Sequence, residues 1–158
     1  TLKKDIDAFS YTESKDVKGF ISFFKRHVGS KYKALNSSAY ERLHDFMIQS
    51  FDKGIGSIEI VSMGKESLCM TFVIDFGETR YYIKGAATEE GRKSGAMTHL
   101  LDRLIKEAHG KGLKKFDFVG SNNENLMSFN KKFGAINRTY DILKNNNLFW
   151  PLSKLIKP

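Results

Sequence analysis

Apolar positions in the first third of the chain recur at helical spacing. Residues 14–28 and residues 38–52 each carry apolar side chains three and four positions apart, which places those side chains on one face of a helix. Ser14 is a suitable cap for the first segment, and Gly29 and Gly54 follow the two ends. The pattern therefore predicts two amphipathic helices that each pack one face on a core.

The period changes in the middle of the chain. Segments 56–63, 67–75 and 79–85 are rich in β-branched and aromatic residues, and short polar links that contain glycine join them. One face of the middle segment is predicted to carry Leu68, Met70, Phe72 and Ile74. Both faces of this segment are apolar, so the pattern predicts a three-stranded antiparallel meander that is covered on both sides.

Helices and short strands alternate in the rest of the chain. Residues 94–109 have the clearest helical periodicity, and two glycines end that segment. Residues 114–119 are predicted as a strand, 124–133 as a helix and 136–143 as a final strand. No linker, repeat or low-complexity segment interrupts this order. We therefore expect a single α/β (α+β) domain over residues 1–158, which a longer two-domain protein can contain as one half.

Composition limits the class of protein. The apolar content of 41% and the aromatic content of 13% are those of a globular domain. No apolar run approaches the roughly 20 residues of a membrane helix, so we expect no membrane insertion and a cytoplasmic location. Cys69 is the single cysteine and lies in an apolar segment, which fits a reducing compartment and leaves no disulfide framework.

The chain carries an excess of positive charge. Its formal net charge of +8 favours a polyanionic partner, either nucleic acid or a phosphate-rich cofactor. Most lysines are scattered along the sequence, and a solubilising surface is the simpler explanation for them. Neither the cysteine and histidine spacing of a zinc finger nor an aromatic and basic RNA-binding motif is present.

The loop before the long helix carries the most distinctive chemistry. It contains Gly91, Arg92, Lys93, Ser94 and Gly95. The N-terminus of a helix presents free backbone N–H groups and partial positive charge, and the two basic side chains add formal charge. The spacing is neither GxxxxGK(S/T) nor GxGxxG. We predict an anion site with a pyrophosphate as its natural occupant; the alternative is a tight connection between a strand and a helix.

Together with this loop, the whole order of predicted elements resembles the GNAT acyltransferases. In that family the loop after the fourth strand binds the pyrophosphate of acyl-CoA through a Q/R-x-x-G-x-G/A motif. Arg92 and Gly95 match the motif, and Met97 stands where the family has a small residue. The later stretch NLMSFNKKFGA resembles the family's fourth helix, with Asn130 where a tyrosine general acid is frequent. The resemblance implies a mixed, largely antiparallel central sheet with helices on both faces.

Two spaced patterns are similar to the Fem-type branch of these proteins, which includes peptidoglycan aminoacyltransferases. They are G-x-x-x-F-D-F-x-G over Gly112 to Gly120 and F-x-x-x-F-G-A over Phe129 to Ala135. This likeness implies a second possible donor, an aminoacyl-tRNA, and the positive charge of the chain fits a tRNA partner. A third alternative is a degenerate GNAT-like module that binds without catalysing a reaction.

The family resemblance implies direct transfer of an acyl group, with acetyl-CoA as the expected donor, to an amine held near the first two helices. It implies neither a metal nor a covalent intermediate on the enzyme. Backbone N–H groups near two alanines would polarise the thioester carbonyl, the loop would hold the pyrophosphate, and an asparagine would lie near the CoA chain. In this sequence these positions are Ala86 and Ala87, then Arg92, Lys93, Ser94, Gly95 and Ala96, and finally Asn125.

Asp117 is the named candidate for the catalytic base. It stands between Phe116 and Phe118, and burial there would raise its pKa toward the range that a general base needs. The alternative role is to accept hydrogen bonds from loop N–H groups. Glu59, on the first strand of the meander, is a candidate base of equal standing, and Cys69 is a poor nucleophile in the middle of a strand.

Overall fold

The computed structural model describes residues 8–29, 36–120 and 124–139. The chain divides into two compact units, Thr1–Asn123 and Glu124–Pro158. The first unit holds the sheet and most of the helices. The expectation of one domain over residues 1–158 remains a prediction.

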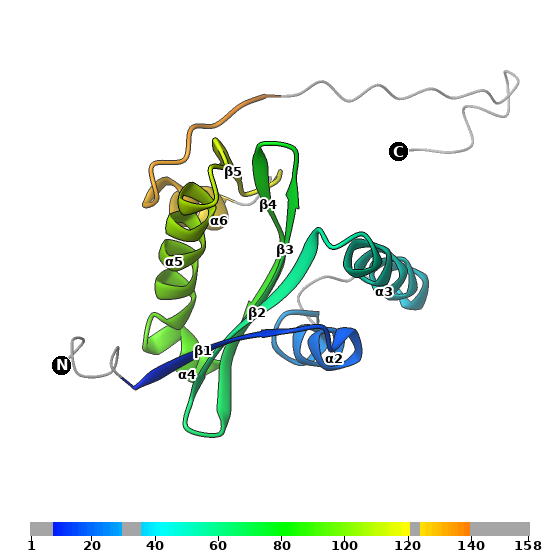
Figure 1. Cartoon of the computed structure of the whole chain (residues 1–158). Coiled ribbons are helices and arrows are strands. Elements are labelled where there is room, and N and C mark those ends of the chain that lie inside the picture. The colour runs from blue at the N-terminus through cyan, green and yellow to red at the C-terminus, as the bar shows by residue number, and fades with distance from the viewer. Residues whose placement is uncertain (1–7, 30–35, 121–123, 140–158) are drawn as a thin grey trace, which may run out of the picture. The chain divides into compact units, whose positions relative to one another are not determined.

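The first unit is built on a five-stranded sheet in the order β1-β2-β3-β4-β5 (Figure 1). Neighbouring strands are antiparallel except for β4 and β5, which are parallel. The strands are β1 (Phe9–Ser14), β2 (Gly56–Met63), β3 (Glu66–Phe76), β4 (Thr79–Ala87) and β5 (Lys115–Asp117). The sheet is thus mixed and largely antiparallel, as the sequence predicted, and β2 to β4 form the predicted meander.

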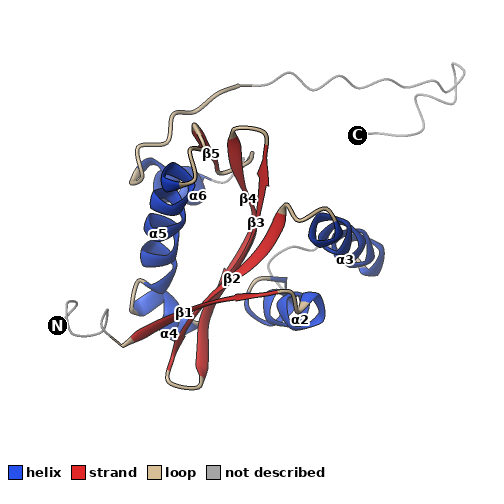
Figure 2. Ribbon diagram, in the orientation of Figure 1, coloured by secondary structure: helices blue, strands red, loops and turns tan. Residues whose placement is uncertain are grey.

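Helices cover both faces of the sheet (Figure 2). Helices α2 (Val17–His27) and α3 (Ser37–Asp52) lie on one face. Helix α5 (Ala96–Gly110) lies on the other, preceded by the short helix α4 (Glu89–Lys93). None of the helices in the described segments is long and apolar enough to cross a membrane.

Each face has its own apolar core, because β3 is buried on both sides. Under α2 and α3 the side chains of Phe72 and Ile74 pack against Phe20 and Met47. Under α5 the core contains Val61, Leu68, Cys69, Val73, Leu100 and Leu104. The sheet is therefore covered on both faces, as the apolar pattern of the middle strand predicted.

Leu68 lies on the opposite face from the one that strict alternation predicted. Cys69 pairs with Val61 and Ser67 pairs with Ser62, so Leu68 is an extra residue on β3. Such a bulge reverses the alternation of side chains beyond it. Leu68 consequently joins the core under α5, whereas Phe72 and Ile74 belong to the core under α2 and α3.

The N-terminal prediction was wrong about Ser14. This residue ends β1, an edge strand that the sequence analysis did not predict. Asp16 caps α2 instead, since its carboxylate accepts the N–H of Gly19 at 2.9 Å. Asn36 caps α3 in the same way through the N–H of Ala39.

The C-terminal predictions fall partly outside the described residues. The predicted strand over 114–119 is shorter and forms β5. In the second unit, α6 (Glu124–Lys131) occupies most of the predicted helix over 124–133, and the rings of Phe129 and Phe133 lie 5.4 Å apart. Residues 136–139 form no strand, which corrects that part of the predicted strand over 136–143. Residues 140–143 lie outside the described segments.

Candidate functional site

Strands β4 and β5 run together for only a short distance. Their ladder ends at the pair Tyr81 and Asp117, while β4 continues to Ala87. Beyond the ladder β4 is paired with β3 alone among the described strands. From Lys84 to Ala87 one edge of β4 therefore presents backbone N–H and C=O groups that an extended ligand can pair with.

A β-bulge distorts β4 where it leaves β5. Tyr82 pairs with Val73 and Lys84 pairs with Phe72, so Ile83 is an extra residue without a cross-strand partner. A bulge bends its strand and increases the local twist. It also places Tyr82 and Gly85 on the same face of the sheet, because their partners Val73 and Thr71 alternate normally.

Tyr82 lies flat along the face of β4 that α5 covers. A Cβ atom on Gly85 would stand 2.0 Å from the phenol oxygen of Tyr82, so the ring end occupies the space that a side chain would fill. That oxygen lies 3.9 Å from the Sδ of Met97 in the first turn of α5. The ring also meets Phe118 edge-on, with centroids 6.2 Å apart. Tyr82, Met97 and Phe118 thus form one wall beside the split, the region beyond Tyr81 and Asp117 where β4 and β5 are no longer paired.

The loop after β4 is fixed by its own contacts. Gly91 is buried, and a Cβ atom there would stand 2.2 Å from the carbonyl oxygen of Leu68, so only glycine fits. The hydroxyl of Thr88 accepts the N–H of Gly91 at 2.9 Å. The guanidinium of Arg92 donates to the carbonyl of Ala87 at 2.6 Å. The loop is therefore packed tightly against the end of the meander.

Helix α5 begins without a side-chain cap. Its N-cap is Gly95 in the left-handed conformation, with φ of 72°. Side chains cap α2, α3 and α4, but no side chain bonds to the first turn of α5. The N–H groups of Ala96 and Met97 have no hydrogen bond within the described residues, whereas that of Thr98 donates to Gly95. The mouth of α5 thus offers free donors and the positive end of a helix dipole.

The other predicted loop residues have partners close by. The ammonium of Lys93 pairs with Glu89 at 2.8 Å on the surface. The hydroxyl of Ser94 donates to the carbonyl of Glu90 at 2.9 Å. Ala96 is fully buried, so neither its side chain nor its backbone is accessible at the surface. Of the residues predicted to bind CoA, Arg92 to Ala96 lie at the N-terminal end of α5.

The C-terminal end of α2 adds positive charge near this loop. Burial lowers the pKa of His27, and the charges of Arg26 and Arg92 lower it further. Neither Arg26 nor Arg92 forms an ion pair within the described residues. An anion at the loop would meet positive charge from two elements that are far apart in the sequence.

Ala86 and Ala87 end β4 beside the split. Both are buried and pair with Met70 and Cys69 of β3. Asn125, the remaining predicted ligand of the CoA chain, lies in α6 of the second unit. Its role stays a prediction.

Asp117 stands at the closed end of the split. It pairs with Tyr81, whose side chain packs in the core under α2 and α3, so Asp117 shares that face of the sheet. Its carboxylate is 2.6 Å from the ammonium of Lys115 and accepts the N–H of Val119 at 2.8 Å. The loop-acceptor role that the sequence analysis named is therefore present, and the catalytic role is left to experiment.

Two other candidates lie away from the split. Glu59 is on β2, separated from β4 by β3, and burial raises its pKa although a hydrogen bond from Ser57 opposes this. Cys69 is fully buried, and burial raises its pKa to about 12. A thiol in that state is a poor nucleophile, as predicted. No group of three His, Cys, Asp or Glu residues in the described segments suits a metal ion.

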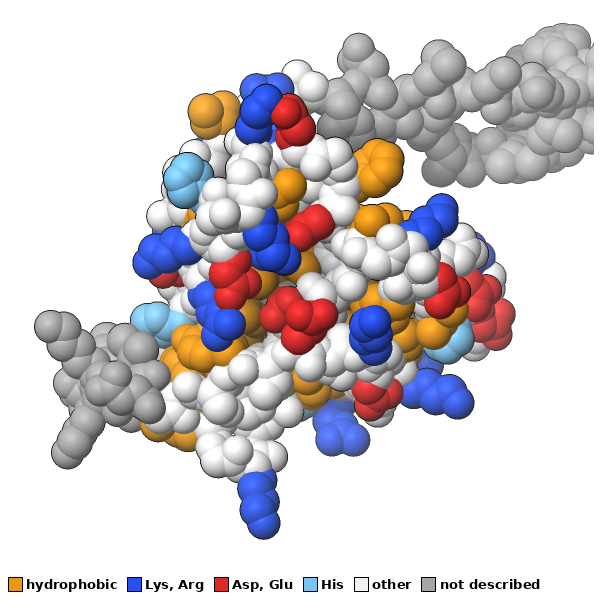
Figure 3. All heavy atoms as spheres, viewed as in Figure 1, with side chains coloured by type: hydrophobic (Ala, Val, Ile, Leu, Met, Phe, Trp, Pro, Cys, Tyr) orange, Lys and Arg blue, Asp and Glu red, His pale blue; other side chains and the backbone are white. Residues whose placement is uncertain are grey.

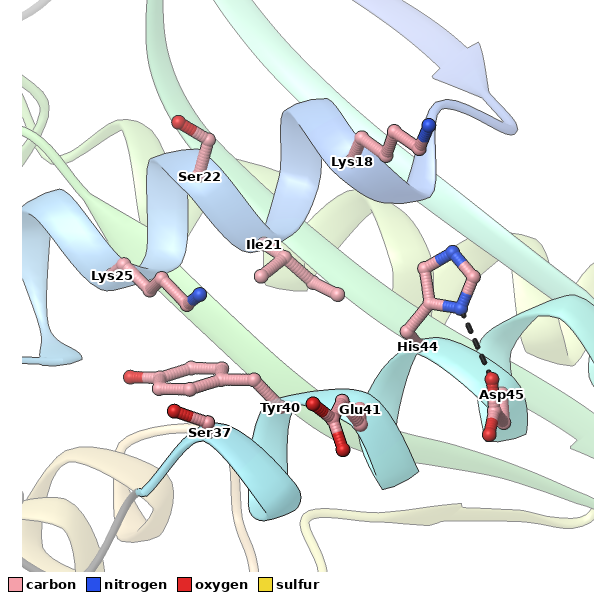
Figure 4. A pocket seen from close by; sticks show the side chains of 9 residues that line it. All are labelled: Lys18, Ile21, Ser22, Lys25, Ser37, Tyr40, Glu41, His44 and Asp45. Carbon is pink, nitrogen blue, oxygen red and sulfur yellow. Dashed lines mark hydrogen bonds and ion pairs between the residues drawn. The ribbon is translucent and has the colours of Figure 1, made fainter.

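A groove of about 600 Å³ opens between α2 and α3 (Figure 4). Lys18 and Lys25 line it from α2, and Glu41 and Asp45 line it from α3. The ammonium of Lys25 lies over the ring of Tyr40, 4.3 Å from its centre. One wall is therefore basic and the other acidic, which suits a polar ligand with amino groups.

A comparison with protein families matches residues 8–125 to the acetyltransferase (GNAT) domain. The chain belongs to this family. It is accordingly an N-acyltransferase, and an acyl-CoA is its co-substrate. The uncapped start of α5 and the open edge of β4 fit the phosphates and the extended arm of such a molecule. The predicted GNAT resemblance is confirmed.

Solved structures share this fold. A predicted acetyltransferase with acetyl-CoA from Clostridium acetobutylicum is 20% identical, with a TM-score of 0.68 over 87% of this chain and 96% of that one. A putative acetyl transferase from Pyrococcus furiosus is 15% identical, with a TM-score of 0.65 over 87% and 99%. An aminoglycoside acetyltransferase from an uncultured soil metagenomic sample, in complex with sisomicin, is 11% identical, with a TM-score of 0.63 over 91% and 99%. No curated protein matches the chain by sequence.

Tyr82 and the bulge at Ile83 are the features of the site that sequence reasoning missed. The segment TRYYIKG alternates too weakly to reveal an extra residue. The signal available was Gly85 inside a strand, because an interior glycine often marks a bulge or a close approach.

Proposed function

We propose that this protein transfers an acetyl group from acetyl-CoA directly to an amine. The observation that carries the proposal is the path along the chain from the uncapped mouth of α5 back to the end of β4, whose edge no described strand covers from Lys84 to Ala87. Anionic phosphates suit the first part of this path and an extended pantetheine amide chain suits the second.

The donor would be held by backbone groups at both ends. The start of α5, with the N–H of Met97, would receive the pyrophosphate, and Arg92 would add positive charge. The thioester would lie by the end of β4, where backbone N–H groups near Ala86 and Ala87 polarise its carbonyl. Fixing the thioester beside an amine supplies much of the rate, because a reaction between two molecules then behaves like one within a single molecule.

The acceptor would approach from the face that α2 and α3 cover. We place it in the groove between these helices, where the carboxylates of Glu41 and Asp45 attract a cationic amine. Helix α2, which forms one wall of the groove, also packs over β3 and β4, the strand beside which we place the donor. The fold is shared with aminoglycoside acetyltransferases, whose acceptors carry several amino groups, which makes a multiply aminated small molecule the acceptor class to test first.

Asp117 is the proposed base. It shares the acceptor's face of the sheet and stands where β4 and β5 part. Its partner Tyr81 precedes Ala86 by five residues on β4, so Asp117 would take the proton of the acceptor ammonium through intervening water, and the neutral amine then attacks the carbonyl carbon. The carbon–nitrogen bond forms, the carbon–sulfur bond breaks, and CoA leaves as the thiol after it takes up a proton.

The second candidate is an aminoacyl-tRNA donor, which the Fem-type patterns and the net charge of +8 favour. On the face seen in Figure 3, however, Lys and Arg alternate with Asp and Glu and form no extended basic patch. We therefore propose acetyl-CoA first.

A donor competition tests the proposal. The protein is incubated with a panel of polyamines and aminoglycosides and with either acetyl-CoA or aminoacyl-tRNA, and products are identified by mass. Acetylated amine with release of free CoA is the expected result. Aminoacylated product, or tRNA binding that weakens steeply with salt while acetyl-CoA is ignored, would support the second donor instead.

A further inference from the structure

We propose that Tyr82, braced by Met97, closes the acyl end of the donor channel and restricts the transferred group to acetyl. The inference rests on the proposed function, because it requires an acyl-CoA along the open edge of β4. It concerns the size of the acyl group, which neither the family nor the groove between α2 and α3 determines.

The position of Tyr82 places its ring where an acyl chain would extend. It is the first residue of β4 beyond the ladder with β5, which ends at Tyr81. Its ring end lies over Gly85, and Gly85 is the neighbour of Ala86, beside which we place the thioester. A chain longer than acetyl that turned toward the α5 side of the sheet would therefore meet the phenol at once.

Neighbouring side chains hold the ring in this position. The bulge at Ile83 brings Tyr82 and Gly85 onto one face, and the absence of a Cβ atom at Gly85 lets the ring lie flat. Met97 contacts the phenol oxygen through its Sδ at 3.9 Å, and Phe118 packs edge-on against the ring. A residue at position 97 with a small side chain would leave the ring unsupported on the side of α5.

Removing the ring would open a pocket rather than collapse the strand. Beside Gly85 on the same face lies its cross-strand partner Thr71, whose side chain is fully buried and whose Oγ1 has no hydrogen-bond partner within the described residues. Val73, the cross-strand partner of Tyr82, forms the next part of the floor. This space would accept the additional methylene groups of a butyryl chain.

The test compares acetyl-CoA with butyryl-CoA in variants of the full chain. The measured quantity is the ratio of kcat/KM for butyryl-CoA to that for acetyl-CoA with one fixed amine. Wild type is expected to favour acetyl-CoA. Tyr82→Ala is expected to raise the ratio by at least about 10–200-fold, because that is the discrimination one methylene in a fitted pocket provides and butyryl carries two methylenes more than acetyl. Met97→Ala is also expected to raise this ratio, because it removes the side chain that supports the Tyr82 ring.

Two controls separate size from chemistry and from general loosening. Tyr82→Phe removes the oxygen that Met97 contacts but keeps the ring and its packing against Phe118, so the ratio should stay much closer to that of the wild type than to that of Tyr82→Ala. Tyr11→Ala truncates a tyrosine on β1, which packs with the same core and lies far from β4 in the strand order. It should leave the ratio unchanged.

The possible failures are distinct. A wild type that uses both thioesters equally, or folded Tyr82→Ala and Met97→Ala variants that keep the wild-type ratio, would overturn the inference while acetyl transfer itself stands. If Tyr82→Ala does not fold, Met97→Ala decides alone. A wild type that binds neither thioester in calorimetry would overturn the proposed function, and this inference with it.

Discussion

At the scale of single residues, Asp117 combines two roles that a substitution can separate. Its carboxylate is an ion-pair partner of Lys115 and an acceptor for the N–H of Val119, and it stands at the closed end of the β4–β5 split. An asparagine keeps the shape and can still accept the N–H of Val119. It cannot take a proton from an ammonium group.

We expect Asp117→Asn to lower kcat by about 10²–10⁴-fold and to leave the Kd for acetyl-CoA nearly unchanged. Steady-state kinetics and calorimetry on the same preparation measure both quantities. Lys115→Ala is the matched control, because it removes the ion pair but retains the carboxylate. A variant that unfolds more easily but retains its turnover would identify Asp117 as a purely structural acceptor.

Glu59 is a carboxylate whose pKa is raised chiefly by burial. Burial raises its pKa, the Ser57 hydroxyl opposes that rise, and the charges of Glu13 and Glu107 add to it. A carboxyl group whose pKa is raised by folding contributes stability below its unfolded pKa, near 4.3, and loses it as the pH rises through the folded pKa. At neutral pH the protein therefore carries a charge that folding disfavours.

Glu59→Gln is thus expected to raise the melting temperature at pH 7, and this advantage should shrink as the pH approaches 4. Thermal unfolding at several pH values measures it. Glu66→Gln, at the exposed start of β3, serves as the control and should change little at either pH. An unchanged or lowered melting temperature of Glu59→Gln at pH 7 would show that the charged form is stabilised in the fold.

At the scale of elements, Arg80 ties β3, β4 and α5 together. Its guanidinium is almost fully buried and donates to both carboxylate oxygens of Asp75 at 2.6 Å. It also donates to the carbonyl of Leu104 at 3.2 Å and lies 3.8 Å from Glu107. Burial by itself would raise the pKa of Asp75, but the hydrogen bonds and charge of Arg80 outweigh it, so the pKa is lowered.

Asp75→Asn should destabilise the protein by about 3 kcal/mol at pH 7, because it leaves a buried guanidinium with only partial compensation from Glu107. The cost should fall at acidic pH. A carboxylate with a lowered folded pKa contributes stability above its unfolded pKa, near 3.9, and loses it as the pH falls through the folded pKa. Urea unfolding at pH 7 and pH 3 measures both effects.

Asp102→Asn is the control for this pair. It breaks an exposed ion pair with Lys106 at the same 2.6 Å distance, and such pairs on a helix contribute only about 0.3–0.5 kcal/mol. Equal losses for Asp75→Asn and Asp102→Asn would contradict the account of Arg80.

The elements that the sequence predicted best are those with a strong local pattern. The periodic apolar pattern predicts helix α5 and strands β2 to β4, and their positions were found to within a few residues. Strand β1 was missed because its alternation, FSYTES, is mostly polar and its pairing with β2 is distant in sequence. The bulges at Leu68 and Ile83 were missed because an extra residue is a property of two paired strands, which one strand's pattern does not reveal.

At the candidate site, too, the sequence predicted the features with a local pattern and missed those that depend on the fold. The loop with Gly91, Arg92 and Gly95 was found from its composition, since glycine and basic residues before a helix point to an anion. Sequence did not reveal that Gly91 serves the contact with Leu68 whereas Gly95 serves the start of α5. Those roles depend on close approach and on φ, which only the fold determines.

At the scale of the whole molecule, two faces of one sheet have different tasks in the proposed reaction. The acceptor groove and Asp117 belong to the face under α2 and α3. The mouth of α5, Tyr82 and Met97 belong to the other face. The split between β4 and β5 joins them, so the donor would lie in the plane of the sheet and the amine would reach it from one side. The central claim is therefore that the phosphates of the donor sit at the mouth of α5.

The most direct measurement of this claim is calorimetry of acetyl-CoA binding to wild type, Gly95→Asn and Gly95→Asp. Asparagine and aspartate are nearly isosteric, both tolerate the left-handed conformation of Gly95, and their side chains would project into open space, with His99 4.0 Å away. The two variants therefore share any strain and differ in charge.

We predict that wild type binds acetyl-CoA and that Gly95→Asp binds it about tenfold or more weakly than Gly95→Asn, because a carboxylate would face the pyrophosphate. The same carboxylate should slightly stabilise α5 through the helix dipole, by about 0.3–1 kcal/mol, so affinity and stability would change in opposite directions. Equal affinities of the two folded variants for acetyl-CoA, or no binding by wild type, would contradict the account.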